Sequence, residues 1–217
     1  MGVTEANKQY RSAKVSVWWD CEKWDDYMNL DPRQIKDNIR SALDRAGYNY
    51  KGSVSIFCYV DEATKIPRQL QKSFSSEGIS IRQYPRGTKL AMILVHTVMW
   101  GDHNPPPANY LFISDDYTFT VIIKHLVRRD YQILLALSPN APSIFVSDPK
   151  AVWLLPSLFS GGSPISKKKW LQLGGYWSDD DEIITGSDDD DDDDDDEIIT
   201  GSDDDEIITG SDDDDDV

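Results

Sequence analysis

The sequence has few cysteines, no long apolar run and no obvious targeting signal. Two cysteines, Cys21 and Cys58, are too few for a disulfide-stabilised scaffold and suit a reducing compartment. No apolar run is long enough to span a bilayer, so we expect no membrane insertion. The first residues, MGVTEANKQY, lack the apolar stretch of a signal peptide, and the last, DDDDDV, match no retrieval or peroxisomal address. We therefore expect a soluble intracellular protein, cytoplasmic or nuclear.

Charge is divided unequally along the chain. Of the 39 acidic residues, 20 Asp and 3 Glu lie in residues 178–217, which contain no Lys or Arg and carry −23. Residues 1–177 hold all 22 basic residues and carry +6. This division points to nucleic-acid binding by the body, or to an interaction between the acidic segment and basic proteins.

The acidic segment is a repeat. The motif DDDEIITGS begins at Asp179, Asp194 and Asp203. Each copy offers only an Ile pair and a Thr for burial, and its like charges repel one another, so it cannot offset the entropy lost on folding. We predict that residues 178–217 form a disordered tail and that residues 163–177, which include KKKW, form a linker.

The body alternates β-rich and helical patterns. Apolar and β-branched runs predict strands at 14–19, 54–59, 79–84, 109–114 and 132–137. A helix is expected to begin at Pro32, with Asp31 as its N-cap, and to stop at Gly47. Further helices are expected at 67–77, 89–100, 119–129 and 148–158. This alternation indicates an α/β fold with a mainly parallel central sheet covered on both faces.

Acidic residues follow two of the predicted strands. Asp20 and then Glu22 follow the first strand, and Asp115 and Asp116 follow the fourth. Ligands of open parallel sheets bind at the carboxyl ends of the strands, and we place these two strands side by side at the centre. The carboxylates of Asp20 and Asp116 should then lie on the order of 4–8 Å apart and suit Mg²⁺ or Mn²⁺, which can activate water at a phosphate. The alternative is that Asp115 and Asp116 only cap the next helix.

Several segments carry a family resemblance. SVWWDCEKW is similar to the W-W-D-x-E-N opening of the NYN domain, and YLFISDDYTF resembles its I-S-G-D-x-D-F segment. WGDHNPPPANY, LVRRDYQILLALSPNAP and AVWLLPSLFSGG resemble plant NYN proteins of the limkain, or meiosis regulator and mRNA stability factor, family. The resemblance covers residues 13–162 and implies a three-layer α/β/α PIN-like fold. It also implies regulation of gene expression through metal-dependent cleavage or binding of single-stranded RNA, and it is the only reason to consider a peroxisomal association.

The chain departs from the family pattern at the site itself. Asp20, Glu22 and Asp116 match acids of the family motifs. Other positions differ from the family motifs. Lys23 replaces the Asn of the first motif, and His96 stands where an Asp of D-K-A-x-x-x-D is expected. In the last segment, Asp115 replaces the Gly and Thr118 replaces the second Asp. Fewer acids hold a metal less firmly, and Lys23 would compete with a cation. A lone His such as His96 is also often structural.

Three functional hypotheses follow. The first is a metal-dependent endoribonuclease with Asp20 and Asp116 as catalytic metal ligands, supported by Glu22 and Asp115. The second is a catalytically inactive NYN domain that binds RNA or a partner. The third is a scaffold whose acidic tail binds basic proteins. For the first two, Lys23, Lys167, Lys168 and Lys169 are candidate RNA-binding residues, although the last three also suit a solvated linker.

Overall fold

The computed structural model describes residues 5–21, 30–48, 54–141 and 149–174. Three of the sequence-based predictions therefore lie outside the described residues: the metal ligand Glu22, the RNA contact Lys23, and the tail at 178–217.

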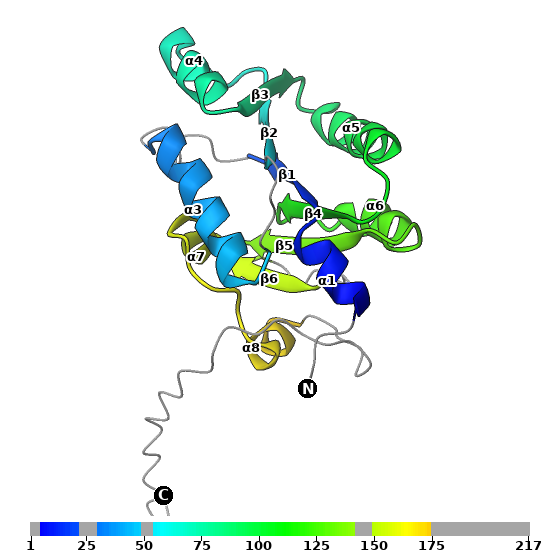
Figure 1. Cartoon of the computed structure of the whole chain (residues 1–217). Helices are drawn as coiled ribbons and strands as arrows, with labels where there is room; N and C mark the ends of the chain where they lie inside the picture. The colour runs from blue at the N-terminus through cyan, green and yellow to red at the C-terminus, as the bar shows by residue number, and fades with distance from the viewer. Residues whose placement is uncertain (1–4, 22–29, 49–53, 142–148, 175–217) are drawn as a thin grey trace, which may run out of the picture.

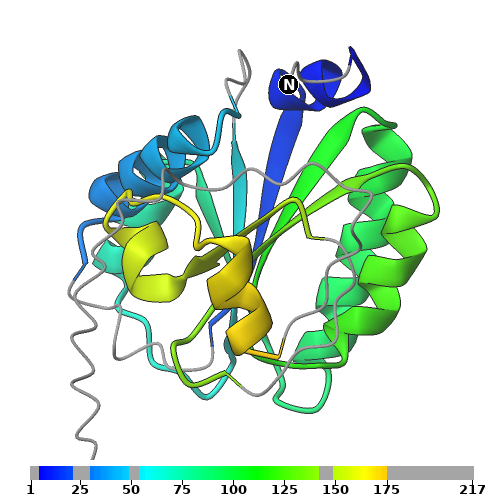
Figure 2. The same ribbon diagram turned by 90° about the horizontal axis from the view of Figure 1, so that it is seen from below.

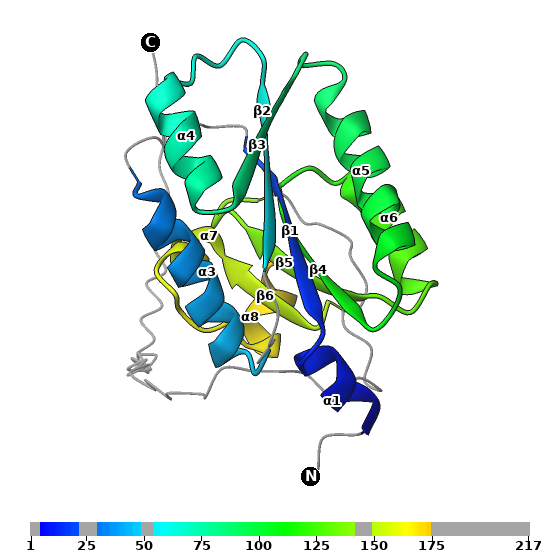
Figure 3. The ribbon, with the colours of Figure 1, turned by 45° about the horizontal axis from the view of Figure 1, so that its top comes forward.

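A parallel sheet forms the centre of the described part of the chain. Its strands are β1 (Lys14–Asp20), β2 (Ser55–Asp61), β3 (Ile79–Tyr84), β4 (Ala108–Ile113), β5 (Gln132–Leu137) and β6 (Ala151–Leu154). They are arranged in the order β3-β2-β1-β4-β5-β6, which runs from top to bottom in Figure 1, and Figure 3 shows the same sheet tilted between its helix layers. β1 pairs with both β2 and β4, so the predicted central placement of the first and fourth strands is confirmed.

Helices cover both faces of the sheet (Figures 1 and 2). Side chains of α3 (Pro32–Arg45), α4 (Arg68–Ser76) and α7 (Leu155–Phe159) pack into one buried apolar cluster. Those of α5 (Lys89–His103), α6 (Phe119–Val127) and α8 (Lys167–Gln172) pack into another on the opposite face. α1 (Glu5–Arg11), which the sequence did not suggest, precedes β1. The α/β architecture is confirmed, and within the described ranges no helix combines the length and apolarity needed to cross a bilayer.

Side chains alternate along β1, so its two tryptophans pack against different helix layers. Successive strand residues point to opposite faces. Trp18 accordingly packs in the α5–α6 cluster and Trp19 in the α3–α7 cluster, and each is 1% exposed. Asp20, the next residue, returns to the face covered by α5, and this places a carboxylate at the carboxyl edge of the sheet.

The predicted helix over 148–158 is wrong in its first part. Ala151–Leu154 is strand β6, which pairs with β5 in parallel, and the helix α7 begins only at Leu155. The run AVWL supplies the β-branched and aromatic residues that a buried strand favours, whereas Pro156 fits the first turn of a helix.

The predicted linker at 163–177 is also wrong for its central part. Ser166 caps helix α8 by accepting a hydrogen bond from the backbone nitrogen of Lys169 at 3.2 Å. The Trp170 side chain is 1% exposed and lies in the α5–α6 cluster. The backbone nitrogen of Ile165 donates to the carbonyl oxygen of Val152 on β6 at 2.7 Å. Trp170 follows three lysines and showed no hydrophobic period in the sequence. Its burial nevertheless packs α8 against the rest of the domain.

Candidate functional site

Four polar residues form a row across the carboxyl edge of the sheet. Asp20 pairs in register with Tyr59, which pairs with Arg82 on β3. Residues paired in this way project to the same face of a sheet. On the other side of β1, the Ser114 hydroxyl donates to Asp20 Oδ2 at 3.2 Å. We call Ser114, Asp20, Tyr59 and Arg82 the polar row.

Asp20 is the buried acid of this row and already has a cation beside it. Its side chain is 2% exposed, and Lys89 Nζ, at the first residue of α5, lies 2.5 Å from Asp20 Oδ1. Apart from this ammonium group, Asp20 Oδ1 has no hydrogen-bond partner within the described part of the chain. Lys89 is itself 13% exposed. The carboxylate is therefore neutralised inside the fold.

Asp116 and Asp115 have separate local partners. Asp116 Oδ1 accepts from the backbone nitrogen and the hydroxyl of Thr118, at 2.8 and 2.7 Å, just before α6. The backbone nitrogen of Asp116 donates to the Ser114 hydroxyl at 3.1 Å, which links Asp116 to Asp20 through one side chain. Asp115 Oδ1 instead accepts from the backbone nitrogen of Ser138, after β5, at 2.8 Å. The predicted alternative, that these two acids only cap the next helix, is wrong: the N-cap of α6 is Thr118, and Asp115 is bonded to the residue after β5.

The other end of the polar row is cationic and aromatic. His96 on α5 is close to Arg82 and Tyr59: its Nδ1 lies 2.8 Å from an Arg82 nitrogen and 2.9 Å from the Tyr59 hydroxyl. A guanidinium can only donate, so Nδ1 accepts and the neutral ring carries its proton on Nε2. Burial, and secondarily the charge of Arg82, lowers the pKa of His96, while burial raises the pKa of Tyr59. His96 therefore favours the neutral form beside Arg82.

The remaining candidate RNA contacts are not brought to this place. Lys167, Lys168 and Lys169 lie in the first turn of α8. The segment leading into α8 is bonded to β6, and β6 is an edge strand separated from β1 by β4 and β5. Lys168 and Lys169 are exposed there.

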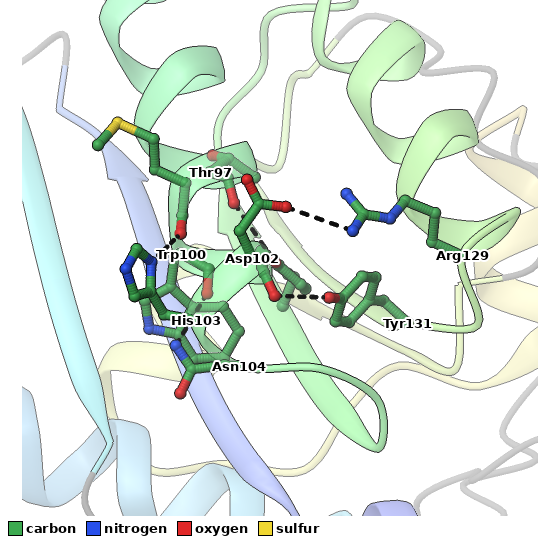
Figure 4. Close-up of polar contacts among 10 residues, drawn as sticks. Thr97, Trp100, Asp102, His103, Asn104, Arg129 and Tyr131 are labelled. Carbon is green, nitrogen blue, oxygen red and sulfur yellow. Dashed lines mark hydrogen bonds and ion pairs between the residues drawn. The ribbon is translucent and has the colours of Figure 1, made fainter.

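A second polar cluster lies at the other end of α5 and has a structural explanation (Figure 4). Side-chain donors from Tyr131, His103 and Asn104 bond carbonyl oxygens of the last helical turn at 2.8–2.9 Å. Arg129 and Asp102 form an ion pair of 3.3 Å alongside them. The last carbonyl groups of a helix have no partner within the helix, and these contacts supply one.

The sequence of this chain matches a known protein family. The family model for the NYN domain matches residues 14–152. The chain belongs to the NYN domain family. No curated protein matches it. Among solved structures, a protein of unknown function from Vibrio parahaemolyticus is similar at 12% identity and a TM-score of 0.41, over 78% of this chain and 95% of that one.

The carboxylates of this NYN domain do not meet the needs of the divalent metal that the resemblance implies. Such a metal prefers several oxygen ligands free to turn toward it. Here Lys89 stands at Asp20, while Asp116 and Asp115 accept hydrogen bonds from the backbone. The described ranges contain no group of three or more His, Cys, Asp or Glu side chains arranged to hold a metal ion. As they are bonded in this structure, Asp20, Asp115 and Asp116 therefore do not fit a divalent cation.

Sequence reasoning missed Lys89, Tyr59 and Arg82 in this NYN domain. One signal could have found Lys89. A lysine at the first position of a helix meets the positive end of the helix dipole, which is unfavourable unless an anion lies close by. The helix follows a strand whose carboxyl end lies at the same edge as Asp20, and this identifies the anion. No comparable signal marks Tyr59 or Arg82, whose alignment with Asp20 depends on strand register.

Proposed function

We propose that this NYN domain binds single-stranded RNA at the carboxyl edge of its sheet and regulates RNA by binding it, without metal-dependent cleavage. The observation that carries the proposal is the Lys89–Asp20 ion pair. It occupies the acid around which a metal-dependent site would be built, so that the charge of Asp20 is already balanced by Lys89.

The charge and chemistry of the edge suit RNA. Lys89 and Arg82 bring two positive charges to the polar row, against the single negative charge of Asp20. The rings of Tyr84 and His96 lie 6.0 Å apart between their centroids, and both side chains are partly exposed. Cationic groups that hold phosphates, together with aromatic rings on which bases stack, are the usual means of binding single-stranded RNA.

Binding and cleavage of a fluorescent single-stranded RNA, each measured with EDTA and with Mn²⁺, test this proposal. We expect binding in EDTA and no cleavage in either condition. Arg82→Gln should weaken binding and lower the steepness of log affinity against log salt by about 0.7, because one phosphate contact of a single strand is lost. Lys72→Gln, the same loss of charge at an exposed residue of α4, is the matched control. Absence of RNA binding at low salt would refute the proposal.

The second candidate function is a metal-dependent endoribonuclease, and a specific observation favours it. The hydroxyl of Ser114 joins the side chain of Asp20 to the backbone of Asp116, so both predicted catalytic acids lie at the same edge. In this case the same assay would show cleavage that EDTA abolishes and that Asp20→Asn and Asp116→Asn each remove.

The finer assignments rest on the sequence alone. We propose membership of the plant limkain-type group from the segments quoted above, and a role of residues 178–217 in binding basic proteins from their charge of −23. Capture of basic proteins by an isolated 178–217 peptide, compared with a peptide in which Asn replaces Asp, tests the second assignment.

A further inference from the structure

The Lys89 ammonium group, at the first residue of α5, occupies the position that a bound cation would take beside the Asp20 carboxylate. Lys89 Nζ lies 2.5 Å from Asp20 Oδ1, and the two side chains are 13% and 2% exposed. A carboxylate removed from water to this extent needs a cation within ion-pair distance. In this fold the cation is covalently attached to the chain.

The backbone around Lys89 keeps the ammonium group at the site. The backbone nitrogen of Lys89 donates to the carbonyl oxygen of Pro85 at 3.0 Å, and the next residue, Leu90, packs against the α5–α6 cluster. The lysine is therefore delivered to Asp20 by the start of the helix itself. A second cation at Oδ1 would meet both the ammonium group and the positive end of the helix dipole.

We propose that Lys89 is a built-in replacement for a divalent cation at Asp20, and that it makes the edge of the sheet exclude such cations. Removing the ammonium group exposes a latent divalent-cation site made of Asp20, with Asp116 joined to it through Ser114. This exclusion decides which cation the site accepts. It does not depend on RNA being the ligand, so failure of RNA binding would leave it standing.

Paramagnetic broadening of backbone amide signals by Mn²⁺, in the isotope-labelled full chain, tests the proposal. Mn²⁺ bound by the Asp repeats broadens signals of the tail, whereas Mn²⁺ at Asp20 broadens those of Cys21, Ser114 and Asp116. In the wild type we expect broadening in the tail only. Lys89→Met keeps an apolar stem of similar length. In this variant the signals of Cys21, Ser114 and Asp116 should broaden at a Mn²⁺ concentration at least about tenfold lower than in the wild type. This factor matches the smallest change, about one pKa unit, that a close charge makes to the affinity of a carboxylate for a proton.

Three further variants separate the causes. Lys89→Arg keeps the charge and should still exclude Mn²⁺. Lys124→Met removes one charge from an exposed position of α6 and should behave as the wild type. Lys89→Met combined with Asp20→Asn should lose the new broadening. Broadening around Asp20 in the wild type would overturn the proposal even if Lys89→Met does not fold, and so would a folded Lys89→Met that shows none.

Discussion

At the scale of single residues, His96 shows how one position changes the chemistry of the edge. The sequence resemblance predicts an acid there, and this chain has a ring whose Nδ1 accepts from Arg82 at 2.8 Å. An acid would have formed an ion pair with Arg82 and drawn its charge away from a ligand. The neutral ring leaves that charge available.

The pH dependence of stability tests this arrangement. Because the pKa of His96 is lowered from 6.5, the unfolded chain takes up a proton at a higher pH than the folded protein does. The contribution of His96 to stability is therefore complete above this value and is lost as pH falls toward the folded pKa. The difference in unfolding free energy between wild type and His96→Gln, from urea titrations at about pH 7.5 and about pH 5.5, should shift against the wild type at the lower pH. A difference that does not change with pH would show that His96 titrates normally.

The residues of the site differ in how far the sequence could predict them. Asp20 and Asp116 could be placed at one edge because each follows an apolar strand, and parallel strands end together. The partners of the two acids could not be predicted, since Lys89 comes from the start of a helix and Ser138 from the end of β5. Such contacts depend on the packing of elements that are distant in the sequence.

At the scale of elements, long periodic segments were predictable and short ones were not. α3 has its N-cap at Asp31 as expected, and Ile35, Ile39 and Leu43 form its buried face. β6 and α7 together occupy only Ala151–Phe159, too few residues for a repeating pattern. Their identity is decided by pairing with β5 and by the cover that α3 provides.

Helix α8 offers the sharpest test at this scale. If Trp170 anchors α8 on the fold, Trp170→Ala should lower the free energy of unfolding by about 3–5 kcal/mol, the usual cost of truncating a buried aromatic residue. The neighbouring Leu171 is 46% exposed, so Leu171→Ala is the matched control and should change stability by about 0.5 kcal/mol or less. Equal, small effects of both substitutions in denaturant titrations would mean that the segment is a linker after all.

At the scale of the whole molecule, the acidic segment at 178–217 is long enough to reach the basic surface of the rest of the chain. Residues 178–217 carry −23 and the rest of the chain carries +6. If residues 178–217 are disordered, as their composition predicts, they span about 35 Å, and repulsion between their charges extends them further. We propose that the acidic segment competes with RNA phosphates for the basic groups of the body, because both present closely spaced anions.

Deleting residues 178–217 should then strengthen RNA binding at low salt. The gain should shrink as salt rises, because screening weakens the contacts of both competitors. Fluorescence anisotropy of a labelled RNA with the full and the shortened chain, over a series of salt concentrations, measures this effect. Equal affinities at low ionic strength would leave the segment with a role in solubility alone.

The carboxylate of Asp20 in this NYN domain holds Lys89 and not a divalent metal. A crystal structure of the full chain from crystals soaked in Mn²⁺, with anomalous data collected near the manganese edge, tests this occupancy. We expect Lys89 Nζ at ion-pair distance from Asp20 Oδ1 and no anomalous peak between Asp20 and Asp116. A manganese peak coordinated by Asp20, with the Lys89 side chain turned away, would contradict it.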